Sequence, residues 1–151
     1  MDKLKWCCGK KDGIEIIEEK PHLSEGYMNE AQKDLNEIPK ANDKWKTIIS
    51  YYACYEALYS LAMKCGIKCE IHDCTIELMK LFQFEESEIA FIKNLKEERE
   101  GSQYYLKREK INKYEDVKRF ILRCKEISLT LSSKRREDIR KHINLMQKGE
   151  K

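Results

Sequence analysis

The sequence has few of the residues that interrupt helices, since its 151 residues include only 2 prolines and 6 glycines. This scarcity excludes collagen-like and Pro/Gly-rich disordered chains, and the length suits a single domain. No apolar run approaches the roughly 18–20 residues that a membrane span requires. Lys and Glu interrupt residues 1–20 throughout, so this segment does not resemble a signal peptide. We therefore expect a soluble cytoplasmic protein with no membrane association.

An excess of charge of one sign is also nearly absent from the whole chain. Its 30 Lys and Arg residues oppose 27 Asp and Glu residues, which leaves a net charge of +3. The excess is local, because residues 134–151 hold seven basic and three acidic residues. Attraction for polyanions is therefore expected near this segment, although a solvated helix face gives the same count.

The chain has seven cysteines, an odd number, and no recognisable export signal. We therefore expect no disulfide framework, and free buried thiols or a metal site remain open. Cys65, Cys69, His72 and Cys74 place four soft ligands within ten residues, as tetrahedral zinc requires. The alternative is a loop histidine bonded to the backbone and cysteines that serve as small apolar side chains. We prefer that alternative and predict no metal site and no cofactor.

Apolar residues recur at helical spacing along most of the chain. We predict an all-α fold, an up-and-down antiparallel bundle of four to five helices within residues 23–133. Residues 1–22 form an N-terminal extension, either a short strand-like arm around Ile14–Ile17 or disordered, and residues 134–151 form a basic helical tail. The predicted helices run from Ser24 to before Pro39, from Asp43 to Cys65, briefly from Cys74, from Glu86 to Glu98 before an interruption at Gly101 and Ser102, and from Tyr114 onward through the tail.

The helix predicted over residues 43–65 has apolar stripes on two sides and a third face of small residues, which are Ser50, Ala53, Ala57 and Ser60. A surface helix needs only one apolar stripe, so this helix is enclosed on most sides. It is either central in a bundle or in contact with another subunit. Its tyrosines, Tyr51, Tyr52, Tyr55 and Tyr59, are expected to be core and subunit contacts rather than a platform for stacked bases.

Arg99 continues the buried stripe that Ile92 and Leu95 begin, because it follows them by seven and four residues. One interpretation is that its guanidinium faces a groove where the bundle opens near Gly101. The other is that it snorkels to the surface or pairs with a buried acid such as Glu56.

Four segments together resemble the prokaryotic HEPN domain: residues 51–58 (YYACYEAL), residues 66–68 (GIK), His72 and residues 99–104 (REGSQY). The resemblance extends over about residues 24–132. It implies an antiparallel helical bundle that commonly forms a homodimer. Many members of the family are metal-independent RNases or toxins with an Arg-x(4–6)-His motif in a cleft at the dimer interface. Others pair with a minimal nucleotidyltransferase in toxin–antitoxin or nucleotide-binding systems.

The chemistry of that motif explains its residue types. Arginine offers a bidentate fork to a phosphate, and histidine can move the proton of a ribose 2′-hydroxyl near pH 7. In this chain Tyr104 stands where the RNases have histidine, and Tyr105 follows it. A phenol is ionised to roughly one part in a thousand at pH 7, so it is a poor general base but can bind phosphate or stack on a base.

The resemblance therefore implies a protein that binds RNA or nucleotide phosphate, as a weak or degenerate endoribonuclease of a toxin–antitoxin system. Arg99 and Tyr104 are the candidate catalytic residues, and both also belong to the substrate-binding set with Tyr105 and His72. The alternative is a non-enzymatic interaction module that binds a nucleotidyltransferase partner. The sequence leaves open whether any catalysis occurs.

A second Arg-x5-His match, Arg136 and His142, lies in the basic tail. Six positions on one continuous helix turn the two side chains to different faces. This match also lies beyond the region that resembles the HEPN domain, so we interpret it as part of a solvated helix face.

Overall fold

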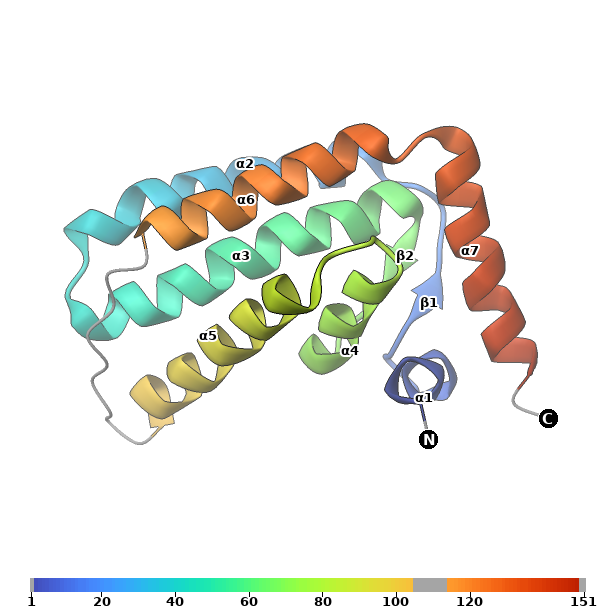
Figure 1. Ribbon diagram of the computed structural model, residues 1–151, viewed down its shortest axis with the longest axis horizontal. Helices are drawn as coiled ribbons and strands as arrows, with labels where there is room; N and C mark the ends of the chain where they lie inside the picture. The colour runs from blue at the N-terminus through green and yellow to red at the C-terminus, as the bar shows by residue number, and fades with distance from the viewer. Residues whose placement is uncertain (1, 105–113, 150–151) are drawn as a thin grey trace.

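The computed structural model describes residues 2–104 and 114–149. Four long helices form an up-and-down antiparallel bundle, which confirms the predicted all-α fold (Figure 1). The four helices are α2 (Pro21–Glu37), α3 (Asp43–Cys65), α5 (Glu86–Tyr104) and α6 (Tyr114–Thr130). Helix α3 lies in the middle of the bundle, with α2 and α6 along one side of it and α5 along the other.

The shorter elements gather at one end of the bundle, where both chain termini lie (Figure 1). A two-stranded antiparallel sheet pairs Glu15 with Lys68 and Ile16 with Ile67. These shorter elements are α1 (Lys3–Gly9), β1 (Glu15–Ile16), β2 (Ile67–Lys68), α4 (His72–Glu77) and α7 (Ser133–Lys148), with a 3-10 turn at Leu78–Lys80. A second 3-10 turn, at Ile38–Lys40, joins α2 to α3 at the other end of the bundle.

Helix α3 begins and ends at residues suited to those positions. The side chain of Asn42, one residue before the predicted cap Asp43, accepts a hydrogen bond of 3.1 Å from the backbone N–H of Trp45. Gly66 ends the helix in the left-handed conformation with φ of 73°. A side chain there would also collide with the carbonyl oxygen of Ile17, because an added Cβ would lie 2.5 Å from it.

The small-residue face of α3 lets α2 approach closely. Ser24 Oγ donates to the Ser60 carbonyl at 2.8 Å, and Ser60 Oγ donates to the Ser24 carbonyl at 2.7 Å. Ala53 and Ala57 are fully buried. Helix α3 also contacts α5 and α6, so the first alternative from its sequence pattern, a central helix, is the one observed.

The N-terminal residues contribute to the core of the protein. Sequence spacing predicted a strand-like arm or disorder, and β1 lies within the expected strand, but helix α1 was not anticipated. Leu4, Cys7 and Ile14 are buried in the same core as the bundle residues. The expectation that no disulfide forms is corrected for one pair, because Cys7 forms a disulfide with Cys74 of α4. The expectation of free buried thiols is confirmed for Cys54, Cys65, Cys69 and Cys124.

Two predicted helix ends differ from the structure. Helix α5 continues through Gly101 to Tyr104, because a single glycine weakens a helix without ending it. The last helix was expected to continue into the basic tail, but α6 ends at Thr130. Ser132 then caps a separate helix, α7, by accepting a bond of 3.2 Å from the N–H of Arg135. Among the described residues, no helix combines the length and apolar character that crossing a membrane requires.

The basic tail is attached to the body through its arginines. Arg136 Nε donates to Glu19 at 3.1 Å, and Arg140 Nη1 donates to the same carboxylate. Arg140 also reaches the carbonyl of Cys65 at 3.3 Å, at the end of α3. Two of the charges that could have attracted a polyanion therefore hold α7 in place.

Candidate functional site

Arg99 of α5 lies in a cradle of two tyrosine rings from α3. Its guanidinium carbon is 5.1 Å from the ring centre of Tyr51 and 5.5 Å from that of Tyr52. Arg99 Nη1 also donates a hydrogen bond of 3.1 Å to the Tyr52 hydroxyl. The residue is only 8% exposed, so it does not snorkel to the surface. The aromatic faces stabilise the buried cation and fix the plane of the guanidinium.

His72, the first residue of α4, belongs to the same cluster. Its Nδ1 atom lies 2.8 Å from the Tyr51 hydroxyl. Its ring is stacked on Tyr55 at 4.1 Å between ring centres, with 15° between the planes. The Tyr55 hydroxyl in turn is 3.0 Å from Thr75 Oγ1 of α4. We call Arg99, His72, Tyr51, Tyr52 and Tyr55 the Arg–His cluster.

The position of the proton between Tyr51 and His72 follows from burial. Tyr51 is completely buried, and burial raises the pKa of its hydroxyl far above the ordinary value, so the hydroxyl remains protonated. Within the described residues, His72 Nδ1 is the acceptor in reach of that proton. Neutral His72 therefore carries its own proton on Nε2.

The charge of His72 follows from its neighbours. Burial lowers the pKa of His72 below its usual range, and the positive charges of Arg99 and Lys96 lower it further. The imidazole is therefore uncharged at neutral pH. In this state its Nε2–H is a hydrogen-bond donor.

A charged cavity of about 590 Å³ adjoins the Arg–His cluster, between α1, α4 and α5. Lys96 lines it and lies 3.3 Å from Asp73 and 3.2 Å from Glu100. Lys3 of α1 and Lys93 of α5 also line it. The cavity holds as many carboxylates as ammonium groups, so its charges are largely paired with one another.

The structure does not test the predicted pair of Arg99 and Tyr104. Tyr104 is the last residue of α5 and its side chain lies outside the described part of the chain, as does all of Tyr105. The structure instead brings Arg99 together with His72. Sequence reasoning selected both residues but did not identify Tyr51 and Tyr52 as the groups that join them.

Glu56 is not the partner of Arg99. Its carboxyl faces the acids Asp34 and Glu30 of α2. Burial and these two neighbours raise the pKa of Glu56 well above its usual value. The proposed buried pair between Arg99 and Glu56 is therefore replaced by the contacts of Arg99 with tyrosines.

The four residues considered for zinc do not form one site. Cys74 is bonded to Cys7, and Cys69 Sγ donates to the carbonyl of Ile71 at 3.4 Å. Cys65 is fully buried at the end of α3. Within residues 2–104 and 114–149, no three His, Cys, Asp or Glu side chains are grouped as metal ligands would be.

The two residues of the second arginine–histidine match also have different surroundings. Arg136 binds Glu19, as described above, and its Nη1 donates to the carbonyl of Leu131 at 2.7 Å. His142 is exposed on α7. The tail therefore follows the interpretation of a helix face, with part of its charge used for docking.

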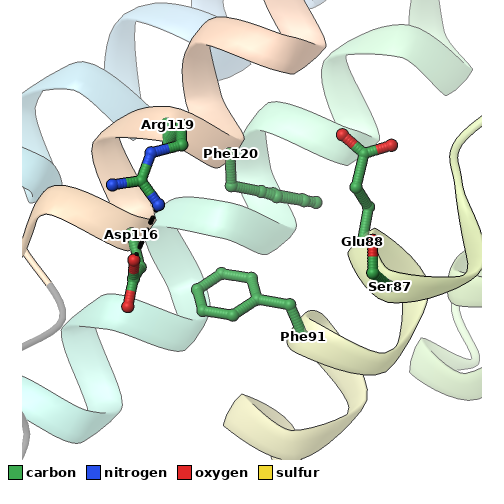
Figure 2. A pocket seen from close by; sticks show the side chains of 6 residues that line it. All are labelled: Ser87, Glu88, Phe91, Asp116, Arg119 and Phe120. Atoms are coloured by element: carbon green, nitrogen blue, oxygen red, sulfur yellow. Dashed lines mark hydrogen bonds and ion pairs between the residues drawn. The ribbon is translucent and has the colours of Figure 1, made fainter.

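A smaller pocket of about 260 Å³ lies between α5 and α6 (Figure 2). The rings of Phe91 and Phe120 enter it from the two helices, with centres 5.9 Å apart. On its rim, Arg119 Nη1 donates to Asp116 at 2.9 Å. Glu88 accepts a bond of 3.0 Å from Arg123. The charged groups of this rim are paired, so the Arg–His cluster is the better candidate for binding a phosphate.

Comparison of the chain with protein-family models, with curated proteins and with solved structures found no match. A functional interpretation therefore depends on the chemistry of the Arg–His cluster and its surroundings.

Proposed function

We propose that the protein binds phosphate groups of single-stranded RNA or of a nucleotide at the Arg–His cluster. The observation that carries this proposal is that one group of tyrosines holds both Arg99 and His72, which come from different helices. The resemblance to HEPN domains, which places an arginine and a histidine in the nucleic-acid cleft of that family, supports the same interpretation.

Each side chain of the cluster has chemistry suited to a phosphate. The guanidinium is planar and presents its N–H groups at its edge, where a phosphate accepts two parallel hydrogen bonds. Neutral His72 adds the Nε2–H donor. The rings of Tyr51 and Tyr52 restrict Arg99, which lowers the entropy lost on binding.

The same geometry favours binding over efficient cleavage. A general base needs an unprotonated nitrogen that faces the 2′-hydroxyl of the ribose. In His72 the nitrogen without a proton is Nδ1, and the Tyr51 hydroxyl occupies it. We therefore infer slow metal-independent endoribonuclease activity at most. Under this proposal two copies of the chain pair so that their clusters share a cleft, as in toxin–antitoxin HEPN proteins.

One observation favours the second candidate function, an interaction module for a protein partner such as a nucleotidyltransferase. Leu129 and Leu122 of α6 are 88% and 49% exposed, and they lie seven residues apart on one face of the helix. Adjacent apolar side chains on a helix surface are typical of protein contacts.

Fluorescence anisotropy with labelled single-stranded RNA in EDTA, at two salt concentrations, tests the proposal. Arg99→Gln removes the charge and keeps much of the side-chain length, so we expect the Kd to rise at least about tenfold, equivalent to about 1.4 kcal/mol. Lys141→Gln is the matched control, because Lys141 belongs to α7 rather than to the Arg–His cluster and forms an exposed ion pair with Glu137. The control is expected to change the Kd less than about twofold.

Circular dichroism shows whether each variant is folded. Equal RNA affinity of the Arg99→Gln and wild-type proteins would remove Arg99 from the site. An absence of RNA and nucleotide binding by the folded wild type would leave the interaction module as the better account. In that case Leu129→Lys, which adds a charge to the exposed apolar face, should abolish partner binding.

A further inference from the structure

The disulfide between Cys7 and Cys74 joins the first helix to the element that carries His72. The two cysteines are 67 residues apart in sequence, and both are fully buried. Cys74 lies two residues after His72 and directly precedes Thr75, which contacts Tyr55 of the Arg–His cluster. The covalent link is therefore connected to the site through one turn of α4.

Besides the disulfide, hydrogen bonds and apolar contacts hold α1 in place. The carbonyl of Cys7 accepts a bond of 2.9 Å from the N–H of Ile14, and the carbonyl of Cys8 accepts one of 3.4 Å from Gln147 Nε2 of α7. Leu4 supplies a buried apolar contact. Helix α1 has seven residues and contacts mainly α4 and α7 rather than the four long helices of the bundle, so its local opening costs less free energy than unfolding of the bundle.

Helix α1 also forms one side of the charged cavity beside the Arg–His cluster. Lys3 lines this cavity opposite Asp73 of α4 and Lys96 of α5. Movement of α1 away from α4 would widen the cavity toward these two residues. Asp73 and Lys96 are also charged neighbours of His72, so a change at this wall of the cavity would alter the surroundings of the cluster.

We propose that Cys7–Cys74 is a site of thiol–disulfide exchange that controls access to the charged cavity next to the Arg–His cluster. The reductant is a small thiol of the glutathione class. Local opening of α1 exposes the bond, and one thiolate attacks a sulfur to form a mixed disulfide while the other cysteine leaves as a thiolate. A second thiolate attacks the mixed disulfide. Two electrons and two protons then reside on the Cys7 and Cys74 thiols, and the two thiols that supplied them leave as one disulfide.

The exchange itself does not depend on the proposed phosphate binding, so the two can fail separately. The test equilibrates the full chain with glutathione mixtures of graded ratio, blocks free thiols in acid and maps every cysteine by mass spectrometry. We expect one transition in which Cys7 and Cys74 change together from bonded to free. Cys54, Cys65, Cys69 and Cys124 are expected to remain thiols at every ratio.

Amide hydrogen exchange on the oxidised and reduced protein tests the structural consequence. We expect reduction to raise the exchange rates of the amides of α1 at least about tenfold and to leave those of α3 unchanged. Cys7→Ser should show the fast exchange in α1 under both conditions. Cys8→Ala, a matched variant on the same helix, should retain the dependence on the glutathione ratio.

Three results would overturn the proposal. The first is free Cys7 and Cys74 thiols in the most oxidising mixture, and the second is a pairing of either cysteine with a different partner. The third is unchanged exchange in α1 after the bond has opened. Loss of RNA binding in Arg99→Gln, measured separately, bears on the proposed function and leaves the exchange site unaffected.

Discussion

Replacing Tyr51 by phenylalanine removes a single hydroxyl from the Arg–His cluster and leaves the ring in place. The substitution removes the 2.8 Å hydrogen bond between the Tyr51 hydroxyl and His72 Nδ1. Tyr51 itself is completely buried. The atom left unpaired is Nδ1 of the half-buried His72, and its lost hydrogen bond costs about 1–2 kcal/mol of unfolding free energy. For a domain of this size, that corresponds to a fall in Tm of about 2–8 °C.

Tyr52→Phe provides the matched comparison on the neighbouring residue. The hydrogen bond that it removes is donated by Nη1 of Arg99, a cation that is only 8% exposed. Because hydrogen bonds of charged groups contribute about 1.5–3 kcal/mol, we expect Tyr52→Phe to lower the free energy of unfolding by an amount in this range. Calorimetry and urea unfolding measure both variants.

The nitrogen resonances of His72 provide an independent measurement of the same interaction. In the wild type they should show the tautomer with the proton on Nε2, and Tyr51→Phe should increase the fraction with the proton on Nδ1. A Tyr51→Phe protein with unchanged stability and an unchanged tautomer would refute the assigned geometry of the cluster.

Three further predictions concern titratable groups. Because the pKa of His72 is lowered in the folded protein, the unfolded chain binds more protons than the folded one below about pH 6.5. The free energy of unfolding of the wild type should therefore fall from pH 7.5 to 5.5, and His72→Gln should flatten this pH dependence in urea unfolding. Because the pKa of Glu56 is raised in the folded protein, this carboxyl group lowers the free energy of unfolding as the pH rises above about 4.5. Glu56→Gln should therefore stabilise the protein at pH 7.5 by up to about 1 kcal/mol, a figure reduced for the partial exposure of Glu56, and should stabilise it little at pH 4. Glu19 has a lowered pKa and binds Arg136 and Arg140, so Glu19→Gln should cost about 1 kcal/mol above pH 4.5 and speed hydrogen exchange in α7. This effect should diminish as the pH falls below 4.5 and the carboxylate of the folded protein becomes protonated.

The parts of the fold that sequence reasoning predicted are those determined by local pattern. Helix α3 has buried residues along most of its length, a polar residue at its start and Gly66 at its end. These local signals define the bounds of the helix almost to the residue. The break between α6 and α7 was missed because Thr130 and Ser132 are compatible with a continuous helix. That end depends on a cap hydrogen bond and on the docking of α7 at Glu19, a residue far away in sequence.

Helix α1 could not be predicted for a similar reason. Helix α1 has only seven residues, too few for a helical period to be distinguished from chance. Its position depends on a long-range contact, the bond between Cys7 and Cys74, and sequence spacing contains no information on which cysteines meet.

The candidate site was predicted in part. Spacing indicated that Arg99 faces the bundle interior, and it does, but spacing could not show which side chains it would meet there. The tyrosines were correctly expected to be mainly core residues. Two of them, Tyr51 and Tyr52, also carry the hydrogen bonds that join His72 to Arg99, an arrangement that arises only when α3, α4 and α5 pack together.

Whether RNA binds at the Arg–His cluster is tested by a titration of the nitrogen-labelled protein with a short single-stranded RNA, in which the Arg99 guanidinium and His72 imidazole signals are followed by NMR. We expect both signals to shift together with one saturable affinity, and inorganic phosphate to compete at high concentration. The account would be contradicted if the RNA bound with signals changing elsewhere in the protein while those of Arg99 and His72 stayed unchanged.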